Sequence, residues 1–233
     1  MTRRDYVVLG DVIASREMDD REAFRDTIAT TLETVNERYA ADVVGRFALV
    51  KGVDEIAGVM RSPRNIYRLV RDVVSAARPG AIRFAVVYGE IDVGAGGDAV
   101  DEMDGPAFHR ADEALVDVAD ADLYLSFSGR RPAFDSLIEA SVNLLLMARE
   151  DWTDRQRAMV AAYEETGTQG AVADRFDVSQ QTVSATLRRA DWRRLGRLEG
   201  DVNAALAGYE ADDGNADGER GVLETLEVED GWE

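Results

Sequence analysis

The 233-residue chain contains no cysteine, one histidine and one lysine. The lack of cysteine excludes disulfides and thiolate metal sites, and no zinc-ligand spacing is present. No Ser/His/Asp set is present, and no glycine-rich loop carries the Lys-Ser/Thr of a phosphate-binding P-loop. No apolar run approaches the roughly 20 residues of a membrane-spanning helix, and no secretory signal follows Met1. We therefore expect a cytoplasmic protein without membrane contact.

The formal net charge is −19, and nearly all basic residues are arginine because Lys51 is the only lysine. A DNA-binding surface is expected to be basic, so this charge argues against a nucleic-acid partner at first sight. However, an aspartate-rich, lysine-poor surface is similar to that of halophilic proteins, which work in a salt-loaded cytoplasm. There the Debye length falls to about 3 Å near 1 M salt, so the acidic residues serve solvation.

The charge is also distributed unevenly along the chain. Residues 152–199 contain eight arginines and seven acidic residues and are nearly neutral. Residues 210–233 contain ten acidic residues and one arginine, a composition typical of a disordered tail.

Residues 170–187 carry the clearest functional pattern, two short helices joined by a tight turn. Asp177 lies where the chain reverses, and Ser179 occupies an N-cap position. Val183 and Leu187 then form an apolar stripe at i, i+4 spacing. This pattern resembles a DNA-binding helix-turn-helix, whose second helix enters the major groove. The resemblance makes the polar residues away from the stripe the DNA-binding candidates: Ser179, Gln180, Gln181, Ser184, Arg188 and Arg189.

A helical hairpin that serves packing alone is the alternative interpretation of the same pattern. The outward face favours DNA binding because it carries amides, hydroxyls and arginines, and Gln and Arg can form bidentate bonds with base edges. Arginines continue beyond the second helix at Arg193, Arg194 and Arg197.

The order of the preceding elements predicts an α+β fold. Strands are expected at residues 5–12, 47–50, 56–60, 81–91 and 123–127, and helices at 21–39, from Pro63, at 106–118 and at 132–149. This is a ferredoxin-like sheet with helices on one face, extended at its end. In the helix at 132–149 we expect Leu137, Val142, Leu145 and Leu146 to be buried. The predicted domains are residues 1–150 (ferredoxin-like), 151–209 (helix-turn-helix, beginning with a helix at 154–166) and 210–233 (acidic tail).

Carboxylates occur at two points that the predicted sheet brings to one edge. Asp11 ends the first strand, and Asp54 with Glu55 forms the tip of the hairpin beside it. Oxygen ligands of this kind suit Mg²⁺, so Asp11 and Asp54 are the metal candidates. Asp is also a common turn former, and a plain turn fits these residues equally well. Arg110 is the candidate for binding a nucleotide phosphate, with a salt bridge as the alternative role.

Two family resemblances follow from these motifs. The two aspartate positions resemble the palm domain of class III nucleotide cyclases, in which such aspartates hold metal ions. Those cyclases carry an asparagine four residues before an arginine; with Arg110 as that arginine the position is Pro106, which argues against cyclase turnover. A closer resemblance, to the SatD family, covers the chain up to about Tyr209. It is carried by residues 10–16 (GDVIASR), Asp54-Glu55, residues 105–111 (GPAFHRA) and the helix-turn-helix.

The SatD resemblance implies a cyclase-like domain joined to a helix-turn-helix, without a settled activity. The favoured hypothesis is a DNA-binding, transcription-regulating protein whose N-terminal domain senses a nucleotide or mediates assembly. A metal-dependent nucleotide enzyme and a pure assembly module are the alternatives. Because two-fold symmetric DNA sites call for dimeric proteins, we also expect a homodimer.

Overall fold

The computed structural model describes residues 2–13, 20–50, 55–78 and 81–209. The strands are β1 (Arg3–Ile13), β2 (Val43–Leu49), β3 (Glu55–Met60), β4 (Ala81–Ile91) and β5 (Leu125–Ser128). The helices are α1 (Arg21–Arg38), α2 (Ile66–Ala76), α3 (Pro106–Asp120), α4 (Pro132–Glu150), α5 (Asp154–Thr166), α6 (Gln169–Phe176), α7 (Gln180–Arg189) and α8 (Trp192–Gly208). Short 3₁₀ turns occupy Pro63–Asn65 and Val100–Glu102. The predicted acidic tail, 210–233, and the metal candidate Asp54 lie outside the described residues.

The strand order confirms the α+β, ferredoxin-like prediction. The sheet runs β2-β3-β1-β4-β5, with β1 antiparallel to both β3 and β4, and β5 parallel to β4. The first four strands have the order of a ferredoxin-like βαββαβ unit, and β5 extends its edge. The central strand β1 is buried from Asp5 to Gly10 because helices cover both of its faces.

The two faces of the sheet have separate cores. Tyr6 and Val8 belong to a core that includes residues of α1, α2, α4 and α8, whereas Val7 and Leu9 belong to a core with α3. The expectation that helices cover only one face is therefore wrong, because α3 packs on the opposite face. Alternate residues of β1 point to opposite faces, and all four from Tyr6 to Leu9 are buried, so each face needs its own cover.

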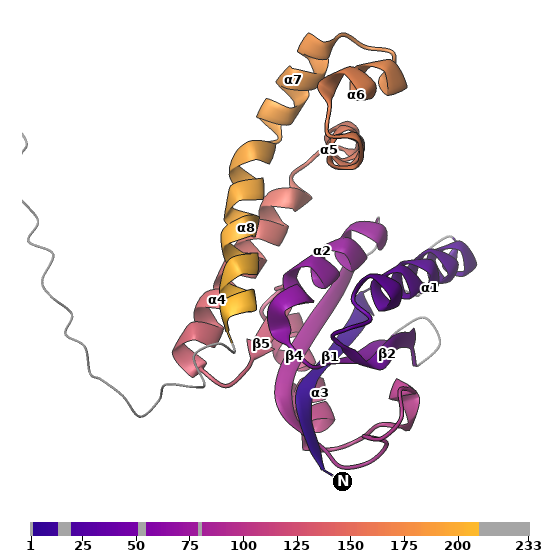
Figure 1. Cartoon of the computed structure of the whole chain (residues 1–233), viewed down its shortest axis with the longest axis vertical. Coiled ribbons are helices and arrows are strands. Elements are labelled where there is room, and N and C mark those ends of the chain that lie inside the picture. The colour runs from indigo at the N-terminus through magenta and orange to yellow at the C-terminus, as the bar shows by residue number, and fades with distance from the viewer. Residues whose placement is uncertain (1, 14–19, 51–54, 79–80, 210–233) are drawn as a thin grey trace, which may run out of the picture.

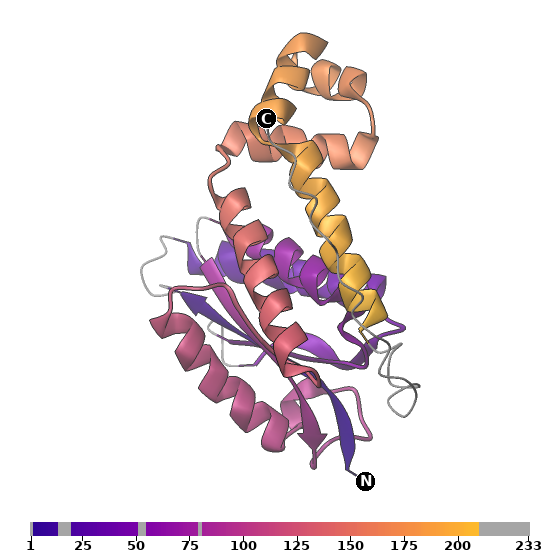
Figure 2. The same cartoon turned by 90° about the vertical axis from the view of Figure 1, so that its left-hand side faces the viewer.

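The helices α5, α6 and α7 lie at one end of the molecule, away from the sheet (Figure 1). Helix α8 leaves this group and runs back along α4 to the sheet, and Figure 2 shows α4 and α8 together in front of it. We call strands β1–β5 with helices α1–α4 the sheet domain. At the end of α8, Leu206 and Tyr209 enter the core of this domain. The Tyr209 hydroxyl donates to Asp135 and accepts from the backbone N–H groups of Arg130 (2.7 Å) and Arg131 (3.0 Å).

Burial along α4 confirms the sequence pattern at three of four positions. Val142, Leu145 and Leu146 are buried as predicted, but Leu137 is 64% exposed. The error arises because α4 is apolar on two sides, and periodicity does not say which side meets the sheet.

Among the residues that the structure describes, no helix combines the length and the apolar character needed to cross a membrane.

Candidate nucleic-acid interface

Local hydrogen bonding explains why residues 168–189 form two helices with a sharp turn. The Thr168 side chain caps α6 by accepting from Ala171 N at 3.3 Å, and Ser179 caps α7 by accepting from Thr182 N at 3.2 Å. Between them Asp177 adopts the left-handed conformation, with φ 50° and ψ 54°. The predicted reversal at Asp177 and the predicted N-cap at Ser179 are both confirmed, because Asp tolerates left-handed geometry and Ser satisfies an orphan N–H group.

A small core of its own holds the three helices together. Val183 and Leu187 form the predicted stripe of α7 and are buried against Val172 and Ala173 of α6. Trp152, just before α5, closes this core, and its indole N–H donates to the carbonyl of Ala190 at 2.9 Å. The helices are thus fixed relative to one another by packing, which leaves the opposite face of α7 uncovered.

All six DNA-binding candidates are exposed to solvent: Ser179, Gln180, Gln181, Ser184, Arg188 and Arg189. Ser184 and Arg188 line one concavity of about 340 Å³ together with Arg193 and Arg194 from the start of α8. Gln169, at the first turn of α6, lines it too. Sequence reasoning missed Gln169; its place directly after the cap Thr168 was the available signal, because helix N-termini offer backbone N–H groups to anions.

Four arginines at this end of the molecule have no acidic partner among the described residues. Within the described residues, Arg188, Arg189, Arg193 and Arg197 form no ion pair, although the chain as a whole is strongly acidic. In the part of the chain that the structure describes, Arg194 pairs with Asp191 alone, at 3.3 Å and at an exposed position. Four cationic side chains within ten residues therefore remain available to an anionic surface.

Arginines in the middle of the molecule, by contrast, pair with acidic side chains. The buried carboxylate of Glu199, on α8, accepts from Arg149 of α4 and pairs with Arg71 of α2 at 3.4 Å. Arg71 in turn pairs with Asp72 at 2.8 Å, and Asp72 also pairs with Arg38 of α1 at 2.9 Å. This chain of ion pairs, which we call the Glu199 network, joins α8 to the helices of the sheet domain.

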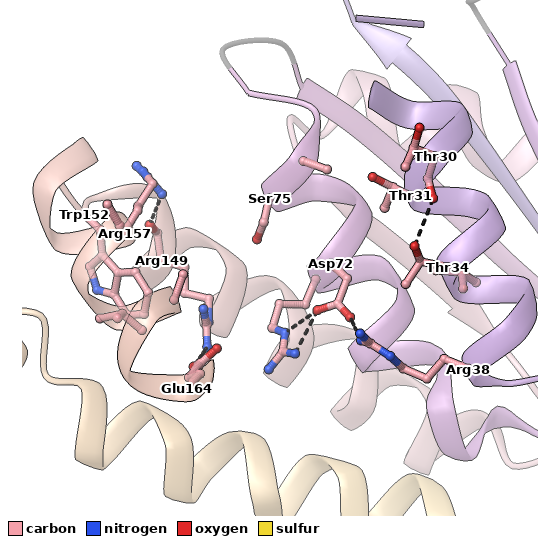
Figure 3. Close-up of a pocket in the computed structure, with 16 residues that line it drawn as sticks. Thr30, Thr31, Thr34, Arg38, Asp72, Ser75, Arg149, Trp152, Arg157 and Glu164 are labelled. Carbon is pink, nitrogen blue, oxygen red and sulfur yellow. Dashed lines mark hydrogen bonds and ion pairs between the residues drawn. The ribbon is translucent and has the colours of Figure 1, made fainter. Parts of the chain in front are cut away.

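A cavity of about 610 Å³ opens beside the Glu199 network, between α1 and α2 on one side and α4 and α5 on the other. Figure 3 shows the α1 residues Thr30, Thr31, Thr34 and Arg38 along one wall, and Arg149, Trp152 and Arg157 along the other. The Arg149 guanidinium lies 4.6 Å from the centre of the Trp152 ring. The cavity has the size and the domain-interface position of many small-ligand sites. Its arginines already have partners, because acidic side chains pair with Arg38, Arg71 and Arg149, and backbone carbonyls accept from Arg157.

The predicted metal site is only half described. Asp11 is exposed near the end of β1, and its register partners are Glu55 on β3 and Arg83 on β4. The expected pairing of the first strand with the hairpin is thus confirmed, while Asp54 lies outside the described residues. Within the described ranges, no three His, Asp or Glu side chains group as ligands of a metal ion.

The nucleotide candidate Arg110 is exposed on α3. Its guanidinium donates to the backbone carbonyl of Tyr88 at 2.7 Å and lines a concavity of about 340 Å³ with Arg4 and Glu90. Gly89 makes this contact possible, because a Cβ there would overlap the guanidinium. Among the described residues, the hydrogen bond of Arg110 goes to a backbone carbonyl, whereas the salt-bridge alternative requires an acidic side chain.

The fold and this end of the molecule define a class of protein: a ferredoxin-like α+β domain that carries a helix-turn-helix. A family model for the SatD family matches residues 6–193, and the chain belongs to that family.

No curated protein matches the chain. Among solved structures, a bacterial light-regulated adenylyl cyclase is similar to it at 12% identity and a TM-score of 0.42, over 54% of this chain. The chain spans only 43% of that cyclase. A regulator of polyketide synthase expression from Bifidobacterium adolescentis is similar at 13% identity and a TM-score of 0.23, over 89% of this chain and 87% of the other. At these levels of similarity, neither structure informs on activity.

Proposed function

We propose that this SatD-family protein is a DNA-binding regulator of transcription that contacts the major groove with α7. The observation that carries the proposal is the open polar face of α7, continued by four arginines without acidic partners within the described residues. Gln180 and Gln181 stand at the start of α7, where recognition helices contact base edges. The arginines that follow suit phosphate oxygens, which fix the protein on the duplex.

The acidic charge of the whole chain sets the conditions for binding. A net charge of −19 repels DNA at long range, but this repulsion is screened beyond about 3 Å near 1 M salt. At short range the arginines beyond α7 meet the phosphates first. We therefore expect sequence-specific contacts to supply more of the affinity than in a basic DNA-binding protein, and non-specific binding to be weak.

Fluorescence anisotropy with labelled genomic fragments, titrated at high salt, tests the proposal. Arg188→Ala should weaken binding to all fragments, and Gln181→Ala should weaken the preferred fragment most, by about 1–3 kcal/mol for a lost base contact. Arg175→Ala is the matched control, because Arg175 is exposed on α6 and its pair with Glu165 (2.7 Å) occupies it. Unchanged binding in both α7 variants would overturn the assignment of the recognition helix.

The role of the sheet domain is proposed as nucleotide sensing or assembly. The Glu199 network connects it to α8, which continues from the recognition helix α7, so a change in the sheet domain has a direct structural route to α7. The candidate ligand-contacting residue is Arg110, whose guanidinium suits phosphate oxygens. Titrating nucleotides against the wild-type protein and the Arg110→Ala variant by calorimetry tests nucleotide sensing separately. Absent binding in both would exclude nucleotide sensing, and equal binding in both would exclude Arg110 as the contact.

The alternative function, a metal-dependent nucleotide enzyme, depends on Asp11 and Asp54 holding Mg²⁺. No observation among the described residues favours it over DNA binding.

A further inference from the structure

Helix α4 is apolar on two sides, and the described residues cover only one of them. Ile138, Val142 and Leu145 are at most 5% exposed in the core of the sheet domain. On the other side Leu137 and Leu144 are 64% and 66% exposed. Apolar helix surface is normally buried, so the described part of the chain leaves this side of α4 incomplete.

The uncovered side of α4 continues onto α8 as one apolar groove of about 530 Å³. Its lining residues on α4 are spaced by four, three and four positions, and those on α8 by three, four and three: Leu137, Ser141, Leu144 and Ala148, then Leu195, Leu198, Val202 and Ala205. This is the alternating spacing with which helices pack in coiled coils and bundles. We call the surface the α4–α8 seam; its two helices face the viewer side by side in Figure 2.

The charges along α8 are complementary to those of a second copy of the same helix. Arg194, Arg197 and Asp201 are exposed near Leu198 of the seam: Arg194 precedes it by four residues, Arg197 is its neighbour, and Asp201 follows it by three. In an isologous pairing whose two-fold axis is perpendicular to α8, the two α8 helices run antiparallel. With that axis near Leu198, Arg194 of each copy lies opposite Asp201 of the other to within one position. The pairing thus sets opposite charges against each other twice, once on each side of the axis.

The acidic tail, 210–233, is the other candidate occupant of the seam. Asp201 is the only ionisable residue among those that line the groove, and it is an acid. The ten acidic residues of the tail would meet Arg194 and Arg197 beside the seam, but inside the groove they would meet an apolar lining and the like charge of Asp201. A second copy brings both signs of charge and a matching apolar surface, so it fits the seam better.

We propose that the α4–α8 seam is the interface between two copies of this chain, in which α4 and α8 of each copy form a four-helix bundle. Only Ala190 and Asp191 separate α7 from α8, so the bundle fixes the two copies of α7 relative to one another. The proposal goes beyond DNA binding and stands without it, because the assembly is measured on the protein alone.

Sedimentation velocity on the full-length protein at high salt is the first test. The wild type should sediment as a species of twice the 25.6 kDa chain mass, and Leu144→Glu and Leu198→Glu should each halve that mass. Both side chains are exposed in the single chain, so these variants should keep their far-UV circular dichroism. Val116→Glu is the matched control: Val116 is 60% exposed on α3, away from the seam, and the variant should remain dimeric.

The absence of natural cysteine permits a second, independent readout. The thiol of a Leu144→Cys variant should react with a maleimide more slowly than that of a Val116→Cys variant, and denaturant should abolish the difference. A monomeric wild type with equal reactivity at both positions would overturn the proposal. Dimerisation that appears only after residues 210–233 are removed would also overturn it, because the tail would then be the native occupant. Dimers that persist in both glutamate variants would place the interface elsewhere.

Discussion

The Glu199→Gln variant tests how firmly α8 is attached to the sheet domain. The substitution keeps the size of the side chain and removes its charge. Glu199 is 5% exposed, and the arginines that meet it, Arg149 and Arg71, have side chains that are 13% and 21% exposed. Burial alone would lower the pKa values of Arg71 and Arg149, but their acidic partners raise both above the ordinary value. Both arginines therefore remain charged in the wild type and in the Glu199→Gln variant.

The expected cost follows from what the two arginines retain. Removing one partner of a fully buried ion pair typically costs 3–5 kcal/mol, because the other charge is left uncompensated. Here Arg71 keeps Asp72 at 2.8 Å and Arg149 keeps Glu164 at 3.3 Å. We therefore expect a loss of about 2–3 kcal/mol, below the range for an abandoned charge. For a chain of this length that corresponds to a fall in Tm of roughly 5–10 °C.

Urea unfolding followed by tryptophan fluorescence measures this loss, since Trp152 lies against Arg149. Glu165→Gln is the matched control: it breaks an Arg–Glu pair of 2.7 Å whose side chains are 56% and 69% exposed. A surface pair of that kind contributes about 0–1 kcal/mol. If both variants lost the same small amount, the Glu199 network would not hold α8, and the proposed route from the sheet domain to α7 would fail with it.

Two further predictions concern Tyr209 and Asp177. Tyr209→Phe should cost about 1–3 kcal/mol, measured by urea unfolding, because Arg130 N–H and Arg131 N–H lose their acceptor. Burial and the bond to Asp135 raise the pKa of Tyr209 to about 12, above the ordinary value of about 10. The stability that the Tyr209 hydroxyl contributes should therefore be complete below pH ~10 and be lost as the pH rises towards 12. Alkali should thus reduce the difference in unfolding free energy between the wild type and Tyr209→Phe. Asp177→Gly should stabilise the protein by about 0.5–1 kcal/mol in the same assay, since glycine adopts φ 50° without strain; a loss would show that the Asp177 side chain contributes more than its conformation costs.

Local signals explain what could be predicted from the sequence. The N-cap at Ser179, the reversal at Asp177 and the helix at 154–166 depend on residues within one or two turns of each other, and all three are confirmed. The strand order follows from the alternation of strands and helices, because few topologies connect such a series without crossings. The exposed face of α7 followed from the spacing of Val183 and Leu187 alone.

Long-range features could not be predicted in this way. Glu199 lies 50 residues from Arg149 and 128 from Arg71 in the sequence, and no periodicity links them. The exposed side of α4 is a related case, because its pattern shows that two sides are apolar without saying what covers each. The metal prediction is a third case: the register of β1 and β3 agrees with it, but its partner Asp54 lies outside the described residues.

Helix α8 connects the three features on which these proposals depend: the α4–α8 seam, the Glu199 network and the recognition helix α7. Leu198 faces the seam and its neighbour Glu199 faces the ion pairs with α2 and α4, because successive residues of a helix point about 100° apart. The end of the same helix is anchored in the sheet domain by Tyr209, and its start follows α7. A shift of α8 against the sheet domain would thus move the seam and the recognition helix together. In the proposed dimer, assembly and the state of the sheet domain therefore both act on the spacing between the two copies of α7, which is the quantity that two DNA half-sites select.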